Sequence, residues 1–86
     1  MIMYNWLVYL LQCSDATYYC GITNDIMKRL NCHNSGKGAK YTRGRLPVTL
    51  LISTNANLSK AEALGLEYTV KQLPRNEKVN FIKNLV

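Results

Sequence analysis

A short turn between two strand-forming segments is the feature that most constrains how the chain folds. The segment from Trp6 to Gln12 is rich in Val, Leu and Tyr, and a second segment runs from about Thr17 to Ile22. Turn-forming residues at 13–16 separate the two, so we predict a β-hairpin. With a three-residue loop at 13–15, Tyr9 would lie opposite Tyr19, whereas a two-residue loop would shift this register.

A helix is predicted after the hairpin, from Asp25 to about Asn34. Thr23 or Asn24 can cap its first turn, and Asp25 complements the positive end of the helix dipole. Gly36 supplies the stop. The next ten residues, GKGAKYTRGR, combine glycines with basic side chains and are predicted to be a loop.

A third strand is predicted at Val48 to Ser53, directly after Pro47. Its continuous apolar run, Leu50 to Ile52, suggests burial on both faces of the sheet.

Two more helices complete the chain. Ser59 and Glu62 have the spacing of a capping box, which opens the first of them. Its apolar residues recur at helical spacing: Ala63, Leu66, Val70 and Leu73. Glu67 lies within this stripe, where an acid is costly unless it has a partner. Pro74 ends the helix and starts the last one, roughly residues 75–85.

The predicted order is strand, strand, helix, strand, helix, helix, which is an α+β fold with helices on a small three-stranded sheet. The length of 86 residues predicts one domain over residues 1–86, and an apolar fraction of 48% suits a folded globule.

The cysteines indicate a cytoplasmic setting. The chain has three cysteines, Cys13, Cys20 and Cys32, and an odd number argues against a closed disulfide framework. Zinc binding by these thiols with His33 is disfavoured, because no close CxxC pair is present. The longest apolar run is too short for a membrane span, and the N-terminus lacks the features of a secretory signal. We therefore expect a soluble protein.

The net charge of +6 is unevenly placed. No acid occurs between Asp25 and Glu62, and this stretch holds seven of the eleven basic residues: Lys28, Arg29, Lys37, Lys40, Arg43, Arg45 and Lys60. Such a block suits a polyphosphate partner, because binding releases counterions. The alternative is an ordinary solvated surface that keeps the protein in solution.

Six side chains are candidates for chemistry: Tyr9, Tyr19, Arg29, His33, Tyr41 and Glu67. Cutting a phosphodiester requires an activated water, compensation of the phosphate charge and stabilisation of the leaving oxygen. Glu67 can hold a hard cation, and Arg29 can grip a phosphate oxygen. A tyrosine can position or deprotonate water if the metal or Arg29 lowers its pKa. His33, on the same helix face as Arg29, can relay or accept a proton. The structural alternatives are core packing for the tyrosines and pairing of Glu67 with Lys71.

The chain resembles the GIY-YIG nuclease family, in particular its small single-domain bacterial members, in four stretches: VYLLQCSDATYYCGIT, MKRLNCH, GKGAKYTRG and ALGLEYTVKQL. The likeness covers roughly residues 5–82. It implies a three-stranded antiparallel sheet with flanking helices, and hydrolysis of phosphodiester bonds in DNA with Mg²⁺ or Mn²⁺.

This resemblance assigns roles by position. Tyr9 and Tyr19 take the places of the two motif tyrosines, and Arg29 that of the helix arginine. His33 falls one turn later, where the family has histidine or tyrosine. Glu67 takes the place of the glutamate that is the sole protein ligand of the metal.

The sequence departs from the family pattern at three points. The first motif reads Leu7-Val8-Tyr9 and lacks its glycine, although Gly21 retains the glycine of the second. Ile22 occupies a position where several members have lysine. A late asparagine of some members has three candidates: Asn76, Asn80 and Asn84.

We therefore predict a metal-dependent endonuclease with little sequence specificity and a role in DNA repair or recombination. Nucleic acid, DNA rather than RNA, would be bound by Lys28, Lys37, Lys40, Tyr41, Arg43 and Arg45. The alternative is a nucleic-acid-binding module of the same fold with little or no catalysis.

Overall fold

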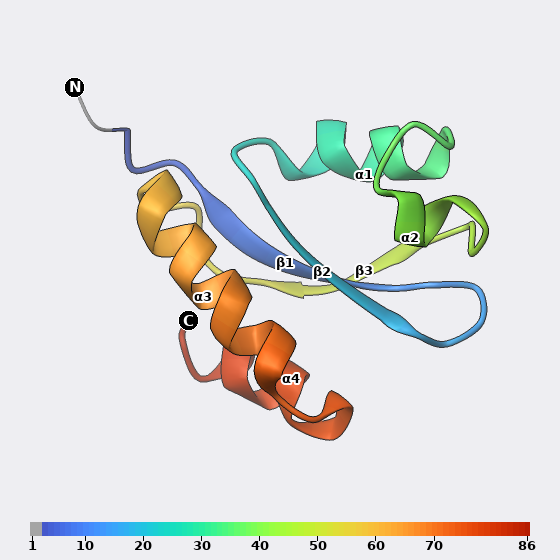
Figure 1. The fold of residues 1–86 in the computed structure, drawn as a ribbon. Helices are drawn as coiled ribbons and strands as arrows, with labels where there is room; N and C mark the ends of the chain where they lie inside the picture. The colour runs from blue at the N-terminus through green and yellow to red at the C-terminus, as the bar shows by residue number, and fades with distance from the viewer. Residues whose placement is uncertain (1–2) are drawn as a thin grey trace.

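A three-stranded antiparallel sheet carries helices on both faces in the computed structural model, which describes residues 3–86 (Figure 1). The elements in chain order are β1 (Leu7–Gln12), β2 (Tyr18–Thr23), α1 (Ile26–Asn34), α2 (Lys40–Arg43), β3 (Thr49–Ser53), α3 (Lys60–Gln72) and α4 (Arg75–Lys83). β1 lies in the centre of the sheet, between β2 and β3. The α+β fold and the predicted order are confirmed, with α2 as an additional short helix inside the predicted loop.

The central strand divides the core into two layers. Alternate residues of β1 point to opposite faces of the sheet. Val8 and Leu10 face α3 and α4, where they pack with Ala63, Val70 and Ile82. The other β1 side chains join a second cluster, with Ile26 and Leu30 of α1: Leu7, Tyr9 and Leu11. β1 is buried because helices cover it on both sides (Figure 1).

The hairpin register differs from the prediction. The loop comprises residues 14–16, one position later than expected, and a 2.8 Å backbone hydrogen bond closes it. Tyr9 therefore lies opposite Gly21, so the prediction that it faces Tyr19 was wrong. The pairing moves by two positions in β2, and a shift of two keeps a side chain on the same face. Tyr9 and Tyr19 thus still share the α1 side of the sheet.

The N-terminal cap of α1 is Asp25, and not Thr23 or Asn24 as predicted. Its carboxylate accepts a hydrogen bond from the backbone N–H of Lys28 at 3.1 Å. The Thr23 hydroxyl instead accepts a hydrogen bond from the N–H of Asp25. The negatively charged carboxylate of Asp25 is therefore the group that binds the N-terminal end of the helix. Gly36, just after α1, has a φ of 81°, a conformation that favours glycine.

The expectation that the third strand is buried on both faces was also wrong. Leu50 and Leu51 remain 38% and 39% exposed. Among the described residues, β3 pairs only with β1 and forms one edge of the sheet. The apolar run therefore belongs to an edge strand that the helices cover incompletely. Val48, just before the strand, is the buried residue of this segment.

The capping box that opens α3 is confirmed. The Ser59 hydroxyl accepts from the N–H of Glu62 at 3.1 Å, and the Glu62 carboxylate accepts from the N–H of Ser59 at 2.8 Å. In the predicted stripe Ala63 and Val70 are buried, and Leu66 and Leu73 are half-buried. α4 ends at residue 83, two residues before the predicted end. Among residues 3–86, no helix is both long and apolar enough to traverse a bilayer.

Gly21 provides the space that Tyr9 occupies, and this contact can be tested. A Cβ at position 21 would lie 2.6 Å from Cζ of Tyr9, whereas one at Gly65 in α3 would meet open space. We expect Gly21→Ala to lower the free energy of unfolding by about 1–3 kcal/mol through overpacking. Gly65→Ala should raise it by about 0.5–1 kcal/mol, because alanine favours the helix. Urea unfolding measures both changes, and equal effects of the two substitutions would contradict the packing of Tyr9 over Gly21.

Candidate functional site

A chain of hydrogen bonds joins β1 to α1 inside the protein. The Tyr9 hydroxyl lies 2.9 Å from Nε2 of His33 and accepts a hydrogen bond from Nε of Arg29 at 3.3 Å. Tyr9 and His33 are almost completely buried. Arg29 and His33 lie four residues apart on α1 and reach the sheet from the same helix face, as predicted.

The environment sets the charge of each group in this chain. Burial raises the pKa of Tyr9 to about 12, although the hydrogen bond and charge of Arg29 act in the opposite direction. Burial, with the charge of Arg29, lowers the pKa of His33 below its ordinary value. The hydrogen bond to Tyr9 raises the pKa of Arg29. At neutral pH the site therefore holds a neutral phenol, a neutral imidazole and a charged guanidinium.

Tyr19 lies at the border between this buried chain and the surface. Its ring centroid is 5.3 Å from that of His33 and 6.4 Å from that of Tyr9. On its other side the ring of Tyr41 stacks at 6.0 Å with an interplanar angle of 25°. The four rings form one aromatic cluster that leads from the interior to the outside.

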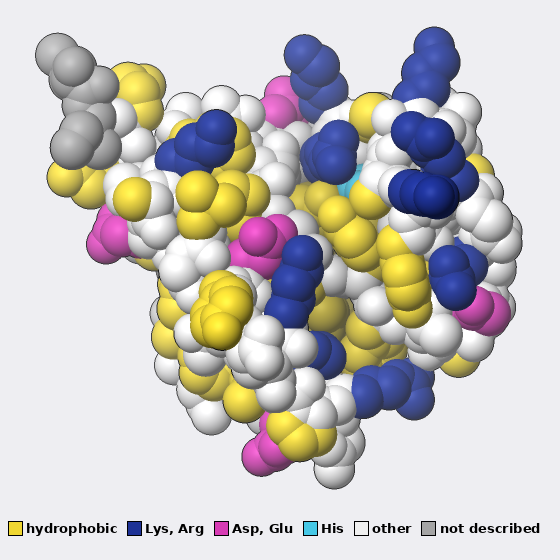
Figure 2. Space-filling model, in the orientation of Figure 1, with side chains coloured by type: hydrophobic (Ala, Val, Ile, Leu, Met, Phe, Trp, Pro, Cys, Tyr) yellow, Lys and Arg dark blue, Asp and Glu magenta, His cyan; other side chains and the backbone are white. Residues whose placement is uncertain are grey.

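A groove of about 280 Å³ follows the free edge of β2 next to this cluster. Its walls are Leu10, Tyr18, Tyr19, Cys20, Tyr41, Lys71 and Lys78. Figure 2 shows hydrophobic side chains in a hollow that is flanked by Lys and Arg. The groove thus combines aromatic faces with positive charge, which are the two features that bind unstacked nucleotides.

Glu67 approaches Tyr19 through Lys71, at the edge of β2, although its helix covers the opposite face of the sheet. Its carboxylate is 3.6 Å from Nζ of Lys71, and this Nζ is 5.8 Å from the ring centroid of Tyr19. The Glu67 side chain is 20% exposed and belongs to α3, which contacts β2. Its charge also contributes, after burial, to raising the pKa of Cys20 to about 12. The pairing with Lys71 is therefore real, and it places the carboxylate beside the groove.

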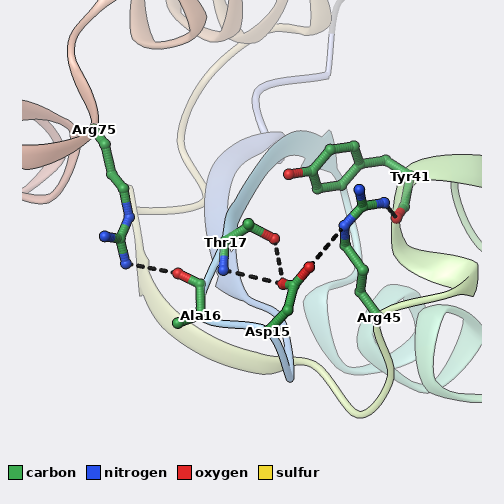
Figure 3. Close-up of polar contacts among 6 residues, drawn as sticks. All are labelled: Asp15, Ala16, Thr17, Tyr41, Arg45 and Arg75. Atoms are coloured by element: carbon green, nitrogen blue, oxygen red, sulfur yellow. Dashed lines mark hydrogen bonds and ion pairs between the residues drawn. The ribbon is translucent and has the colours of Figure 1, made fainter.

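Arg45, predicted to bind nucleic acid, makes internal contacts (Figure 3). Its Nε donates to the Asp15 carboxylate at 3.0 Å, and its Nη1 donates to the backbone carbonyl of Tyr41 at 2.7 Å. Its guanidinium carbon lies 4.0 Å from the centroid of the Tyr41 ring. Arg75 of α4 holds the hairpin loop from the other side, through the carbonyl of Ala16 at 2.6 Å. Arg45 therefore fixes Tyr41 against Tyr19.

The other predicted binding residues surround the aromatic cluster. Arg43 donates from Nε to the carbonyl of Gly38 at 3.3 Å. Lys28 is exposed in the first turn of α1, and Lys37 and Lys40 are on the following segment. In Figure 2 Lys and Arg side chains gather around the single histidine. Within residues 3–86, the ammonium groups of these three lysines take part in no hydrogen bond or ion pair, whereas both loop arginines have internal partners.

Sequence reasoning missed Thr42 and Gly38. Thr42 is fully buried, and its Oγ1 lies 3.0 Å from Nδ1 of His33. Gly38 packs so closely on the imidazole that a Cβ there would lie 2.8 Å from Cγ of His33. Neither contact is visible as a periodic pattern in the sequence, because Gly38 and Thr42 belong to a segment that was predicted to be a loop.

The positions that depart from the family pattern lie outside the hydrogen-bonded chain. Ile22 packs on the cluster below α3 and α4, on the face of β2 opposite to Tyr19. Asn76 and Asn80 are exposed on α4, and Asn84 caps the C-terminal end of that helix. Asn80 and Asn84 border a separate hollow at α4.

No group of three or more His, Cys, Asp or Glu side chains within residues 3–86 is arranged to hold a metal ion. The three cysteines are free thiols. Glu67 offers a hard oxygen ligand at an accessible position, and this suits a cation such as Mg²⁺ that retains most of its water.

Comparison with known proteins agrees with this fold. Residues 5–80 match the GIY-YIG catalytic domain, and the chain belongs to the GIY-YIG family of nucleases. Members of this family generally depend on a divalent metal.

The chain is similar to several UPF0213 proteins and to two solved structures. It is 55% identical over 76 residues to the UPF0213 protein SAG0778 of Streptococcus agalactiae, covering 88% of this chain and 85% of that protein. The solution structure of the UPF0213 protein BH0048 from Bacillus halodurans is 46% identical, with a TM-score of 0.54 over 91% of this chain and 82% of the other. That of EF2693 from E. faecalis is 36% identical, with a TM-score of 0.61 over 95% and 90%.

The lowered pKa of His33 makes the stability depend on pH. In the unfolded chain the imidazole of His33 binds a proton near the ordinary histidine pKa of 6.5. In the folded chain it binds this proton only at a lower pH. We therefore expect the free energy of unfolding to be constant above this value and to fall as the pH drops below it. The slope is at most about 1.4 kcal/mol per pH unit for one proton.

Urea unfolding between pH 5 and pH 8, roughly the range in which histidine titrates, measures this slope. The chain has a single histidine, so His33→Gln is a clean control and should remove the slope. The pKa of Asp15 is also lowered, but this group changes the stability only below its ordinary pKa of 3.8, which is outside the measured pH range. An unchanged slope in His33→Gln would contradict the assignment.

Proposed function

We propose that the chain is a metal-dependent endonuclease that hydrolyses phosphodiester bonds in DNA, with Tyr9, Tyr19, Arg29, His33 and Glu67 as its catalytic residues. The observation that carries this proposal is the buried chain from Arg29 through Tyr9 to His33. The phenol of Tyr9 and the neutral imidazole of His33 form a path for proton transfer. The guanidinium of Arg29, which contacts the phenol, can bind phosphate.

Tyr9 and His33 act together as the base. A phenol with a pKa of about 12 does not lose its proton alone at neutral pH. The neutral His33 accepts the proton of Tyr9 at Nε2, and the Tyr9 oxygen takes a proton from the attacking water. The hydroxide forms a bond to phosphorus, the bond to the leaving oxygen breaks, and that oxygen takes a proton from solvent. His33 then returns its extra proton to solvent through Tyr9, which restores the neutral pair. Tyr19, at the groove wall, positions the water.

Arg29 has donors left for the substrate. Its Nε donates to Tyr9 and its Nη1 to the Sγ of Cys32 at 3.9 Å, which leaves Nη2 for the substrate. Arg29 borders a second hollow, separate from the groove, that is lined also by Thr23, Asn24, Asp25, Lys28 and Cys32. A guanidinium offers paired donors that match phosphate oxygens. Arg29 thus neutralises charge on the phosphate and also stabilises the anionic form of Tyr9.

Glu67 holds Mg²⁺ or Mn²⁺ in this proposal, in exchange for its ion pair with Lys71. When bound, the cation supplies charge stabilisation for the phosphate and the leaving oxygen. Lys71, which lines the groove next to Tyr19, would then be released from Glu67.

The surface around the groove binds the nucleic acid. Lys28, Lys37 and Lys40 contact phosphates, and Arg43 and Arg45 shape the loop between them. Tyr41 offers a ring on which an unstacked base can lie. Phosphate contacts carry no sequence information, so we expect little sequence preference. The family resemblance favours a role in DNA repair or recombination.

The catalytic roles predict that Glu67→Gln and Arg29→Ala each lower the rate of DNA nicking by at least roughly 10²-fold. The first removes the charged metal ligand, and the second removes a donor to the phosphate. A plasmid nicking assay with Mg²⁺ or Mn²⁺ measures the rate. Glu77→Gln, an exposed acid in the first turn of α4, is the matched control and should cut normally. Equal cleavage by all the variants would indicate a contaminating nuclease and reject the assignment.

The binding-module alternative gives a different result in the same assay. It predicts salt-dependent DNA binding by the wild type with no turnover in either metal. The position of Ile22 outside the hydrogen-bonded chain favours the enzyme, because the missing lysine leaves Tyr9 and His33 undisturbed.

The exposed lysines predict the salt dependence of binding. Lys37→Ala combined with Lys40→Ala should reduce the slope of log K against log salt concentration by roughly 0.7–0.9 per lost phosphate contact. Fluorescence anisotropy with a labelled oligonucleotide measures this slope. Lys83→Ala, in the last turn of α4 on the other side of the sheet, is the control and should leave it unchanged. Equal slopes for all three proteins would place the DNA elsewhere on the surface.

A further inference from the structure

Thr42 makes two hydrogen bonds that together fix the proton position on His33. Its Oγ1 lies 3.0 Å from Nδ1 of His33 and donates to the carbonyl oxygen of Ala39 at 2.9 Å. A threonine hydroxyl has one proton, and a carbonyl can only accept. Since that proton is used toward Ala39, the hydroxyl oxygen must accept from His33. Nδ1 therefore carries the ring proton.

The other ring nitrogen is then free to accept. A neutral imidazole has one N–H, so Nε2 presents its lone pair to the Tyr9 hydroxyl at 2.9 Å. The Tyr9 oxygen already accepts from Arg29, and its own proton points toward His33. In the opposite tautomer Tyr9 would receive two donors, and its proton would have no acceptor within this chain. Only one direction of proton transfer fits these contacts, from Tyr9 to His33.

We propose that Thr42 is the positioning residue that sets the tautomer of His33 and thereby makes it a proton acceptor for Tyr9. The catalytic consequence rests on the proposed nuclease function, whereas the tautomer itself does not. Thr42 has no contact with the groove, so its role is exerted through the imidazole alone.

The surrounding loop is built to deliver this hydroxyl. Ala39 is the N-cap of α2, and its carbonyl accepts from both the N–H and the hydroxyl of Thr42. Gly38 lies against the ring, where any side chain would push the loop away from His33. When His33 takes up a proton, the Nδ1–H bond to Thr42 persists and helps to stabilise the imidazolium.

The single histidine makes the proposal directly measurable by NMR. The ¹⁵N shifts of the ring nitrogens distinguish the two tautomers in uniformly labelled protein at neutral pH. We expect the Nδ1–H form in the wild type and in Thr42→Ser, which keeps the hydroxyl. Thr42→Val has a similar shape without a hydroxyl, and we expect it to populate the Nε2–H form.

The nicking assay provides the second readout. Thr42→Val should lower kcat by roughly 10- to 100-fold with little change in KM, as for other residues that orient a catalytic group, and Thr42→Ser should restore it. An Nε2–H tautomer in the wild type would overturn the proposal, even if Thr42→Val failed to fold. Retention of the Nδ1–H form and the wild-type rate in Thr42→Val would overturn it as well. A wild type with the Nδ1–H form but no nuclease activity would refute only the proposed function.

Discussion

The hydrogen bond between Tyr9 and His33 connects the central strand to α1 across 24 positions of sequence, and the rest of the site is arranged around it. Both groups are buried, so loss of either partner would leave the other unsatisfied at a cost of about 1–3 kcal/mol. The bond therefore fixes how α1 lies on the sheet. Gly21 makes room for the phenol below, and Gly38 lets the loop close over the imidazole above.

This arrangement places polar groups inside a core layer, and the layer tolerates them because each has a partner. Arg29 and His33 satisfy the hydroxyl of Tyr9, and Thr42 satisfies the second nitrogen of the imidazole. A fully satisfied buried network is rigid, and rigidity holds reacting groups in position. Access comes from the side, because the groove follows the uncovered edge of β2 next to Tyr19. In the proposed nuclease, the interior would thus supply the geometry of the reacting groups, and the groove at the edge of the sheet would supply the entry for the substrate.

Most elements of the fold follow from local sequence signals, whereas their pairing does not. The capping box at Ser59 and the four-residue spacing of Arg29 and His33 are short-range features, and both predictions hold. The hairpin register depended on whether the loop began at residue 13 or 14, and turn composition does not decide between these. The exposure of β3 depends on its being an edge strand, which no apolar run reveals. Thr42 was missed because a four-residue helix carries no periodicity.

The charge of the glycine-rich loop has two separate functions, which its sequence alone does not distinguish. Arg45 bridges Asp15 and the ring of Tyr41, and Arg43 binds the loop backbone, so both guanidiniums shape the site from within. An arginine suits this role because its planar guanidinium can stack on an aromatic ring and donate several hydrogen bonds at the same time. The ammonium of a lysine is instead a point charge on a flexible side chain. In the proposed function, the exposed lysines of this loop are the groups that attract a polyanion. In the proposed nuclease, this division of the charge would let the surface bind phosphates without strain on the hydrogen bonds that orient His33.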